Sequence, residues 1–452
     1  MQSQSTFNDF EKFKHLLEKY SASMNYHDMS LTENEWKQLY WYMDNTPAVT
    51  PEARTEDLLD KLDFEIKRGL ARRYSFELLL RGDQRAYEEF IQAQNKNLVL
   101  EFADFKKLSD EAKNLNPDVQ AAIKASCFLT IFTSAKRPQE ILQKAGHVLS
   151  SDSEEFLSQF AVVAQQDNSL FPITRNLTQQ QLDLLPKMYW RDMHFRHMLY
   201  TEGADNMTKT FSEGVQSGKF TQQDFVLWKW RWRTNTFGFQ GGPGAKYYDR
   251  ETHLLSEIVF NLLEKIFADP TYSYLDNYLQ KRAELAGLND VAFNLNLAEQ
   301  QLLGHIAANF HRVNVLSHNT GKIIFAAYVE FKKECVDGNK LAAQYEAIRK
   351  NDKAITPTYV TAVLTNAYLF FSNKMSSGES LKRATEFICQ FFSAFYTLSP
   401  EKKISCMNFS KKSLQGVLEK WESDRHAFHF KLNDQSELIA EEAPKLQKVF
   451  NF

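Results

Sequence analysis

Two histidines three residues apart offer the first possible chemistry of this chain. His194 and His197 lie in the stretch HFRH. If this stretch is helical, positions i and i+3 share a face, and the two imidazoles could hold one divalent metal ion. Carboxylates close by in the sequence could add oxygen ligands, namely those of Asp192, Glu202 and Asp205. The pattern therefore indicates a candidate metal site at His194, His197, Glu202 and Asp205.

This stretch is similar to HD-type metal-dependent hydrolases, which use helical His and His-Asp ligands. The adjacent His-Asp pair of that family is absent here, and Thr201-Glu202 occupies the comparable place. The alternative is a pair of helix histidines at a packed or solvated edge, flanked by Arg191 and Arg196. A bare HxxH motif lacks a defining third ligand, which favours this structural alternative.

A second candidate alternates tryptophans with cations. It consists of Trp228, Lys229, Trp230, Arg231, Trp232 and Arg233. Thr221 and Asp224 form a capping-box pattern before it, which predicts a helix with Trp228 and Trp232 on one face. Exposed, such rings and cations could stack on bases, lie at a lipid interface or form a protein-binding hot spot. The alternative, favoured because Trp is mostly buried, is a core cluster whose basic side chains reach out to solvent.

A third candidate is the glycine-rich segment GFQGGPGAK, which ends at Lys246. A phosphate-binding Walker A loop requires Gly-Lys followed by Ser or Thr, and Ala245 and Tyr247 break that pattern. A nest of backbone N–H groups could still bind an anion, with Lys246 beside it. Because Pro and Gly commonly interrupt helices, a turn between two helices is the favoured interpretation.

No nucleophile motif and no cofactor motif completes any of these candidates. GxSxG, HExxH and the kinase motifs are missing, which leaves open whether the chain is an enzyme. A divalent metal enters only under the hydrolase hypothesis. The four cysteines, which lie at positions 127, 335, 389 and 406, form no CxxC pair, and we expect buried thiols.

The elements that position these residues are predicted to be helices. Glycine and proline are scarce, at 16 and 11 of 452 residues, whereas all-β folds need many tight turns. Capping patterns recur, for example at Thr32-x-x-Glu35 and Thr178-x-x-Gln181. We therefore predict an all-α, multi-helix bundle with two or three helical subdomains. The predicted domains are residues 1–170, 171–340, which contains the Trp/Arg segment and the Gly-rich loop, and 341–452.

Charge and hydropathy limit the partners and the location. The formal net charge is −3, so no overall field attracts nucleic acid, and a nucleic-acid binder is a disfavoured hypothesis. The first residues contain no apolar segment typical of a signal peptide. The uncharged run 354–373 contains Pro357 and several Thr and Asn residues, which favours a core helix over a membrane span. We expect a chain without a transmembrane segment that is cytoplasmic in the cell that produces it.

The C-terminal tail carries the one further resemblance. Its sequence, ELIAEEAPKLQKVFNF, begins at Glu437 and places Glu441 and Glu442 before a run that ends in apolar residues. It resembles the C-terminal translocation signals of Legionella-type (Dot/Icm) type IV secretion effectors, as does the Phe-, Asn- and Gln-rich composition. This resemblance implies delivery into the cytosol of a host cell. The alternative is an ordinary amphipathic last helix.

Three hypotheses of function follow from these patterns. The first is an effector-like helical protein that binds a host protein or an anionic membrane surface through residues 228–233 and Lys246. The second is a metal-dependent helical hydrolase centred on His194 and His197. The third is a nucleic-acid binder that uses the Trp/Arg segment.

Overall fold

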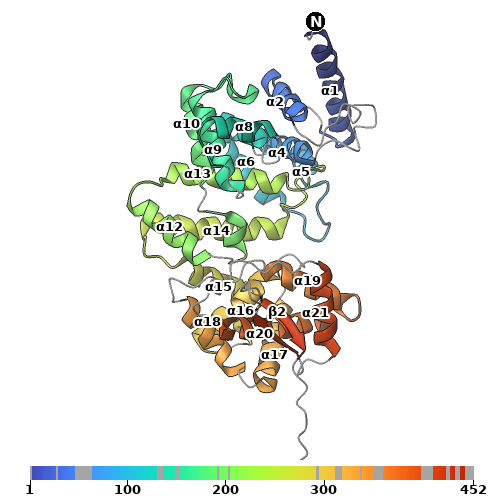
Figure 1. Cartoon of the computed structure of the whole chain (residues 1–452), viewed down its shortest axis with the longest axis vertical. Helices are drawn as coiled ribbons and strands as arrows, with labels where there is room; N and C mark the ends of the chain where they lie inside the picture. Colours follow the sequence, from blue (N-terminus) through green and yellow to red (C-terminus); the bar gives the residue numbers. More distant parts are fainter. Residues whose placement is uncertain are drawn as a thin grey trace, which may run out of the picture. The chain divides into compact units, whose positions relative to one another are not determined.

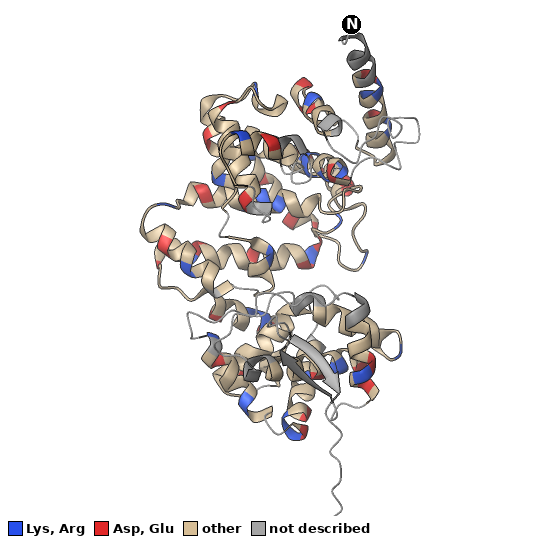
Figure 2. Ribbon diagram, in the orientation of Figure 1, with Lys and Arg blue, Asp and Glu red and all other residues tan. Residues whose placement is uncertain are grey.

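Helices make up nearly all of the regular structure of the chain in the computed structural model (Figure 1). The structure describes residues 3–26, 29–45, 64–129, 136–148, 153–190, 193–201, 204–291, 295–310, 318–335, 338–349, 360–398, 411–423, 428–432 and 438–442. The chain divides into two compact units, Met1–His194 with Ser217–Glu257, and Phe195–Gln216 with Ile258–Phe452. Lys and Arg are interspersed with Asp and Glu along the helices of both units (Figure 2).

The first unit is organised around two helices, α4 (Phe64–Arg81) and α13 (Gln222–Phe237), which pack against each other. α4 also packs against α5 (Gln84–Ile91), α6 (Phe102–Lys113) and α7 (Pro117–Leu129). The other helices of this unit are α1 (Ser3–Ser23), α2 (Glu33–Asn45), α8 (Lys136–Lys144), α9 (Ser153–Gln166), α10 (Gln179–Leu184) and the first part of α14 (Arg250–Ala268). Short 3₁₀ turns lie at Pro172–Thr174 and Pro186–Met188.

Both central helices are buried on more than one face, although they carry many cations. Leu70, Phe76 and Leu79 of α4 and Trp230 of α13 belong to one hydrophobic core. Thr221 caps the start of α13: its hydroxyl accepts from the Asp224 backbone N–H, and its own backbone N–H donates to the Asp224 side chain. Helices surrounded in this way have to satisfy their charged side chains inside the protein.

The second unit is a separate helical body with its own core. Its helices are α11 (Phe195–Leu199), α12 (Ala204–Gln216), the remainder of α14, α15 (Tyr274–Leu285), α16 (Leu297–Asn309), α17 (His318–Glu334), α18 (Leu341–Arg349), α19 (Val360–Ser372), α20 (Ser377–Leu398) and α21 (Lys411–Ser423), with 3₁₀ turns at Leu288–Asp290 and Gly338–Lys340. α15 packs on α16, and α20 packs between α17 and α19. Leu302, Phe371, Phe387 and Trp421 lie in this core.

A short hairpin follows these helices. β1 (Phe428–Leu432) and β2 (Leu438–Glu442) pair antiparallel, with Phe428 opposite Glu442 and Leu432 opposite Leu438. The all-α prediction is confirmed except for this hairpin. The interpretation of the tail as a last helix is wrong for the five residues of β2, because strand pairing satisfies their backbone groups instead.

Several local predictions are confirmed, and the division into units differs from the predicted domains. The capping boxes at Thr178 and Thr221 are present, and the Thr32 and Glu35 side chains cap each other's backbone N–H. The predicted boundary at 170 falls inside the first unit and the one at 340 inside the second. In the uncharged run, α19 is a helix of 13 residues whose Leu364 and Phe371 are buried.

The loop between α13 and α14 is packed closely against α4 and α5. Gly241 and Gly244 both have φ of +62°, a conformation that favours glycine. A Cβ on Gly241 would lie 2.7 Å from the Cβ of Lys67 and 2.8 Å from the backbone nitrogen of Arg68. A Cβ on Gly244 would lie 2.7 Å from the carbonyl oxygen of Phe90. Glycine is therefore required at both positions for the loop to approach these helices.

Replacing Gly241 with alanine is expected to lower the free energy of unfolding by about 1–3 kcal/mol, because the added Cβ meets backbone and the φ is left-handed. Gly242→Ala is the matched control, since no atom lies within 4 Å of the position its Cβ would take. Urea unfolding followed by tryptophan fluorescence compares the two variants. Equal stability would contradict the close packing of this loop.

Candidate functional site

The Trp/Arg segment lies in the core of the first unit. All six side chains from Trp228 to Arg233 are buried, and Trp230 has 0% of its surface exposed. The Trp230 ring packs edge-on against Phe76 of α4, with centroids 5.6 Å apart. The Trp228 indole N–H donates a hydrogen bond of 3.0 Å to the carbonyl oxygen of Met193. The prediction that this segment forms an exposed binding surface is therefore wrong, because burying the rings removes them from any partner.

The cations of α13 do not reach out to solvent either. Lys229 Nζ lies 2.7 Å from a carboxylate oxygen of Glu111, and Arg233 lies 2.6 Å from carboxylate oxygens of both Glu111 and Glu257. Burial alone would raise the pKa of Glu111, but Arg233 and Lys229 outweigh it and hold this pKa below its usual value. The Arg231 guanidinium lies over the Trp232 ring, 4.0 Å from its centroid. These cations have a structural role within the core.

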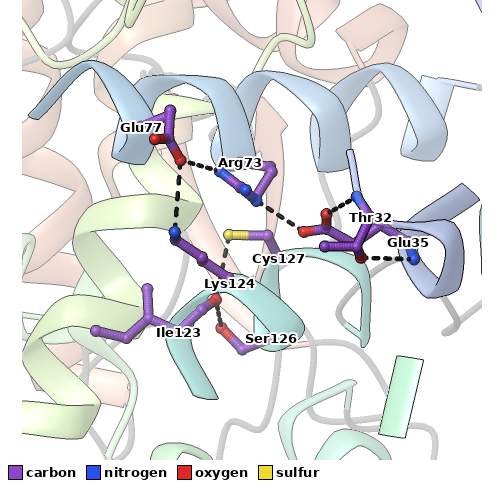
Figure 3. Close-up of polar contacts among 8 residues, drawn as sticks. All are labelled: Thr32, Glu35, Arg73, Glu77, Ile123, Lys124, Ser126 and Cys127. Carbon is purple, nitrogen blue, oxygen red and sulfur yellow. Dashed lines mark hydrogen bonds and ion pairs between the residues drawn. The ribbon is translucent and has the colours of Figure 1, made fainter. Parts of the chain in front are cut away.

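A second ion network lies between α2, α4 and α7 (Figure 3). Arg73 of α4 bonds Glu35 through Nε and Glu77 through Nη1, at 2.7 Å in both cases. Lys124 of α7 lies 3.5 Å from the same Glu77 carboxylate. The side chains of Arg73 and Glu35 are only 5% and 4% exposed, so this pair lies out of contact with bulk water. The network joins three helices through charge-assisted hydrogen bonds.

The thiol of Cys127 lies beside this network and is unsuited to nucleophilic chemistry. Its Sγ is 3.3 Å from the carbonyl oxygen of Ile123, which also accepts a hydrogen bond of 2.8 Å from the Ser126 hydroxyl (Figure 3). Burial raises the pKa of the Cys127 thiol to about 12, although Arg73 and Arg72 act in the opposite direction. The thiol is therefore protonated at neutral pH. Cys127 and Cys389 are buried as predicted.

Two more cysteines complete the predicted set. Cys335 is half-buried, and Cys406 lies outside the described residues.

The two histidines of the predicted metal site do not share a helix. His194 precedes α11, and its ring packs edge-on against Trp232 with centroids 4.7 Å apart, whereas His197 lies within α11. The prediction that they line one helical face is therefore wrong. Glu202 lies outside the described residues, and Asp205 lies in α12 with its side chain not described. Within the described part of the chain, no group of three or more His, Cys, Asp or Glu side chains could hold a metal ion. The hydrolase hypothesis stays a prediction.

The Gly-rich loop connects α13 to α14, as the turn interpretation predicted. Two of its N–H groups bind protein carbonyls, with Gly241 N–H donating to Gly238 at 3.0 Å and Ala245 N–H donating to Phe90 at 2.8 Å. An anion nest cannot use those two donors. The Lys246 side chain is exposed at the end of the loop.

A group of aromatic and basic side chains surrounds this loop, of which three are exposed and three are half-buried. The Arg68 guanidinium lies between two rings, 5.6 Å from the centroid of Phe64 and 5.2 Å from that of Phe239. Phe239 in turn packs edge-on against Tyr247, with centroids 5.5 Å apart. We call this surface the loop patch; it consists of Phe64, Lys67, Arg68, Phe239, Lys246 and Tyr247. Sequence reasoning found only Lys246, because the residues of α4 are about 170 positions away from the loop.

No protein-family model, curated protein or solved structure matches this chain. None of the helices that the structure describes is long and apolar enough to cross a membrane.

Replacing Arg73 with methionine is expected to lower the free energy of unfolding by about 3–5 kcal/mol, because Glu35 is left as a buried charge without its cation. Lys106→Met is the matched control, since Lys106 and Asp110 form an exposed pair expected to contribute at most about 1 kcal/mol. Urea unfolding of both variants gives the comparison. A cost for Arg73→Met no greater than that of the control would contradict a buried ion network.

Low pH is expected to remove the contribution of Glu77 to the free energy of unfolding. Burial alone would raise the pKa of Glu77, but Arg73 and Lys124 outweigh it and hold this pKa below the unfolded value of 4.5. A carboxylate whose pKa is lower in the folded than in the unfolded chain stabilises the fold at pH values above its unfolded pKa. This stabilisation is lost as the pH falls through the folded pKa. The stability difference between the wild type and Glu77→Gln should therefore be largest near neutral pH and shrink below about pH 4.5. Unfolding curves at several pH values measure it, and a difference independent of pH would refute the assignment.

Proposed function

We propose that this chain is a type IV secretion effector of the Legionella (Dot/Icm) type that acts in a host cell as a helical binding protein. The proposal of export is supported by the tail, in which Glu437, Glu441 and Glu442 precede an apolar end, and by the composition. The observation that carries the binding function is the loop patch, where the exposed rings of Phe64 and Tyr247 lie together with the half-buried Arg68 and Phe239. These residue types are enriched at protein interfaces and supply much of their binding energy.

The buried cations of the first unit stabilise the fold and do not contribute to the binding surface. The cations of α13 are neutralised by Glu111 and Glu257, and Arg73 is neutralised by Glu35 and Glu77. Groups paired in this way stabilise the fold and are not available to act on a substrate. A helical protein with many local contacts also refolds quickly, which suits passage through a secretion channel.

The hairpin is compatible with a tail that is read by a secretion machine. Glu441 and Glu442 lie in β2, which pairs only with β1 among the described strands. A two-stranded hairpin has marginal stability by itself, and here β1 also packs against α20. Opening β2 would release the glutamate-rich part of the tail in an extended form.

Export is tested by fusing a reporter enzyme to the N-terminus of the full chain in a bacterium that carries the Dot/Icm machine. Replacing Glu437, Glu441 and Glu442 together with alanine should reduce delivery into host cells to the level of a secretion-defective strain, because the acidic block is lost. The matched control replaces three acids that are exposed elsewhere in the second unit, Asp290, Glu334 and Glu419. Failure of the wild-type fusion to reach the host cytosol would overturn the effector proposal.

A further inference from the structure

We propose that the loop patch binds an extended acidic segment of a partner protein, with glutamates or aspartates on either side of an apolar side chain. The inference rests on the proposed binding function and names the chemistry of the partner. Its basis is the combination, at one place on the first unit, of exposed rings, a rigid loop and cations that lack a carboxylate partner within the described residues.

Two of the three rings of the patch are accessible to a partner. Phe64 is 53% exposed and Tyr247 is 39% exposed, which makes them two of the few large apolar side chains at the surface of the described residues. The Arg68 side chain is 17% exposed, and its guanidinium lies 5.6 Å from the centroid of Phe64 and 5.2 Å from that of Phe239 and so links the two rings. An apolar side chain that covers these rings removes their surface from water, which favours binding.

The patch is also preorganised, because the loop that carries half of it is fixed to the rest of the unit. The Tyr20 hydroxyl donates a hydrogen bond of 2.7 Å to the carbonyl oxygen of Gly241, and the Tyr26 hydroxyl donates one of 2.8 Å to that of Gly242. Burial raises the pKa of Tyr20 to about 12, so this hydroxyl keeps its proton at neutral pH. A rigid binding surface loses little conformational entropy when a partner docks.

The charges of the patch select an acidic partner. Arg68 is paired with Glu65 at 2.6 Å, but Lys67 and Lys246 have no carboxylate partner among the residues that the structure describes. Lys67 lies beside the Tyr20 ring, with its Nζ 5.7 Å from the centroid, and Lys246 is exposed at the end of the loop. Two cations beside exposed rings, without a carboxylate partner in the described part of the chain, are complementary to carboxylates that neighbour an apolar side chain.

The small number of available cations in the patch favours a protein segment over an anionic membrane as the partner. Surfaces that bind acidic lipids by charge carry clusters of about four to eight Lys or Arg residues. The loop patch offers Lys67 and Lys246, while Arg68 is occupied by Glu65. Binding to vesicles is therefore an outcome that would contradict the proposal.

The test uses the full chain and two fluorescein-labelled decapeptides, one with glutamates on both sides of a central Leu-Phe pair and one with lysines in their place. Fluorescence anisotropy should detect binding of the acidic peptide and not of the basic one. Lys67→Glu with Lys246→Glu should weaken binding of the acidic peptide about tenfold or more, because two attractions become repulsions. The matched control, Lys96→Glu with Lys144→Glu, changes the net charge equally at exposed lysines outside the patch and should have little effect.

Lys246→Glu alone is the second variant, since this exposed side chain can change without disturbing the core. Far-ultraviolet circular dichroism and thermal melting verify that each variant is folded. The proposal is overturned if the acidic peptide does not bind up to its solubility limit, if the control variant weakens binding as much, or if vesicles of phosphatidylserine and phosphatidylcholine bind in its place. Such a result together with successful export would refute binding by the loop patch without contradicting the effector proposal.

Discussion

Two arginines inside the first unit require carboxylates from several helices at once, and this requirement constrains the arrangement of the whole unit. Arg233 of α13 meets Glu111 of α6 and Glu257 of α14, and Arg73 of α4 meets Glu35 of α2. A shift of any of these helices would leave a charge in an environment of low dielectric, at a cost of several kcal/mol. The ion pairs therefore select one packing of these helices, whereas the apolar contacts around them supply most of the stabilisation.

This constraint also separates the residues of the core from those at the surface of the loop. The tryptophans and cations of α13 are committed to the core, and the loop that follows α13 is held by Tyr20 and Tyr26. Because the loop is fixed, the side chains of Phe239 and Tyr247 are presented in one arrangement beside Arg68. The core thus positions the surface from which we infer binding.

Local patterns in the sequence predicted local structure well. The starts of α10 and α13 follow from a hydroxyl and an acceptor three residues apart, because both partners of a capping box lie within one turn. The burial of Trp228, Trp230 and Trp232 agrees with the core-cluster alternative and not with the predicted binding surface. The sequence did not show that α11 begins only after His194, because side chains that bond this segment are distant in sequence. The carbonyl of Met193 accepts from Trp228, and that of Leu199 accepts a bond of 2.6 Å from the Tyr278 hydroxyl.

The candidate site was less predictable than the fold, because its residues are distant from one another in the sequence. Lys246 was identified from the Gly-rich loop, but Phe64 and Arg68 belong to a helix far away in the sequence, and only tertiary packing brings them to the loop. One carboxylate partner of α13, Glu111, is similarly remote, 122 residues away from Arg233. Single-sequence periodicity contains no signal for such pairings.

The most direct measurement is the rate at which an amine-reactive acetylating reagent labels two lysines of the native chain, followed by mass spectrometry of the peptides. Lys229 is buried against Glu111, whereas Lys246 is exposed on the loop. The account predicts rapid labelling of Lys246, slow labelling of Lys229, and equal rates for both once the chain is unfolded in urea. Equal rates in the native chain would contradict the central claim that the cations of α13 belong to the core.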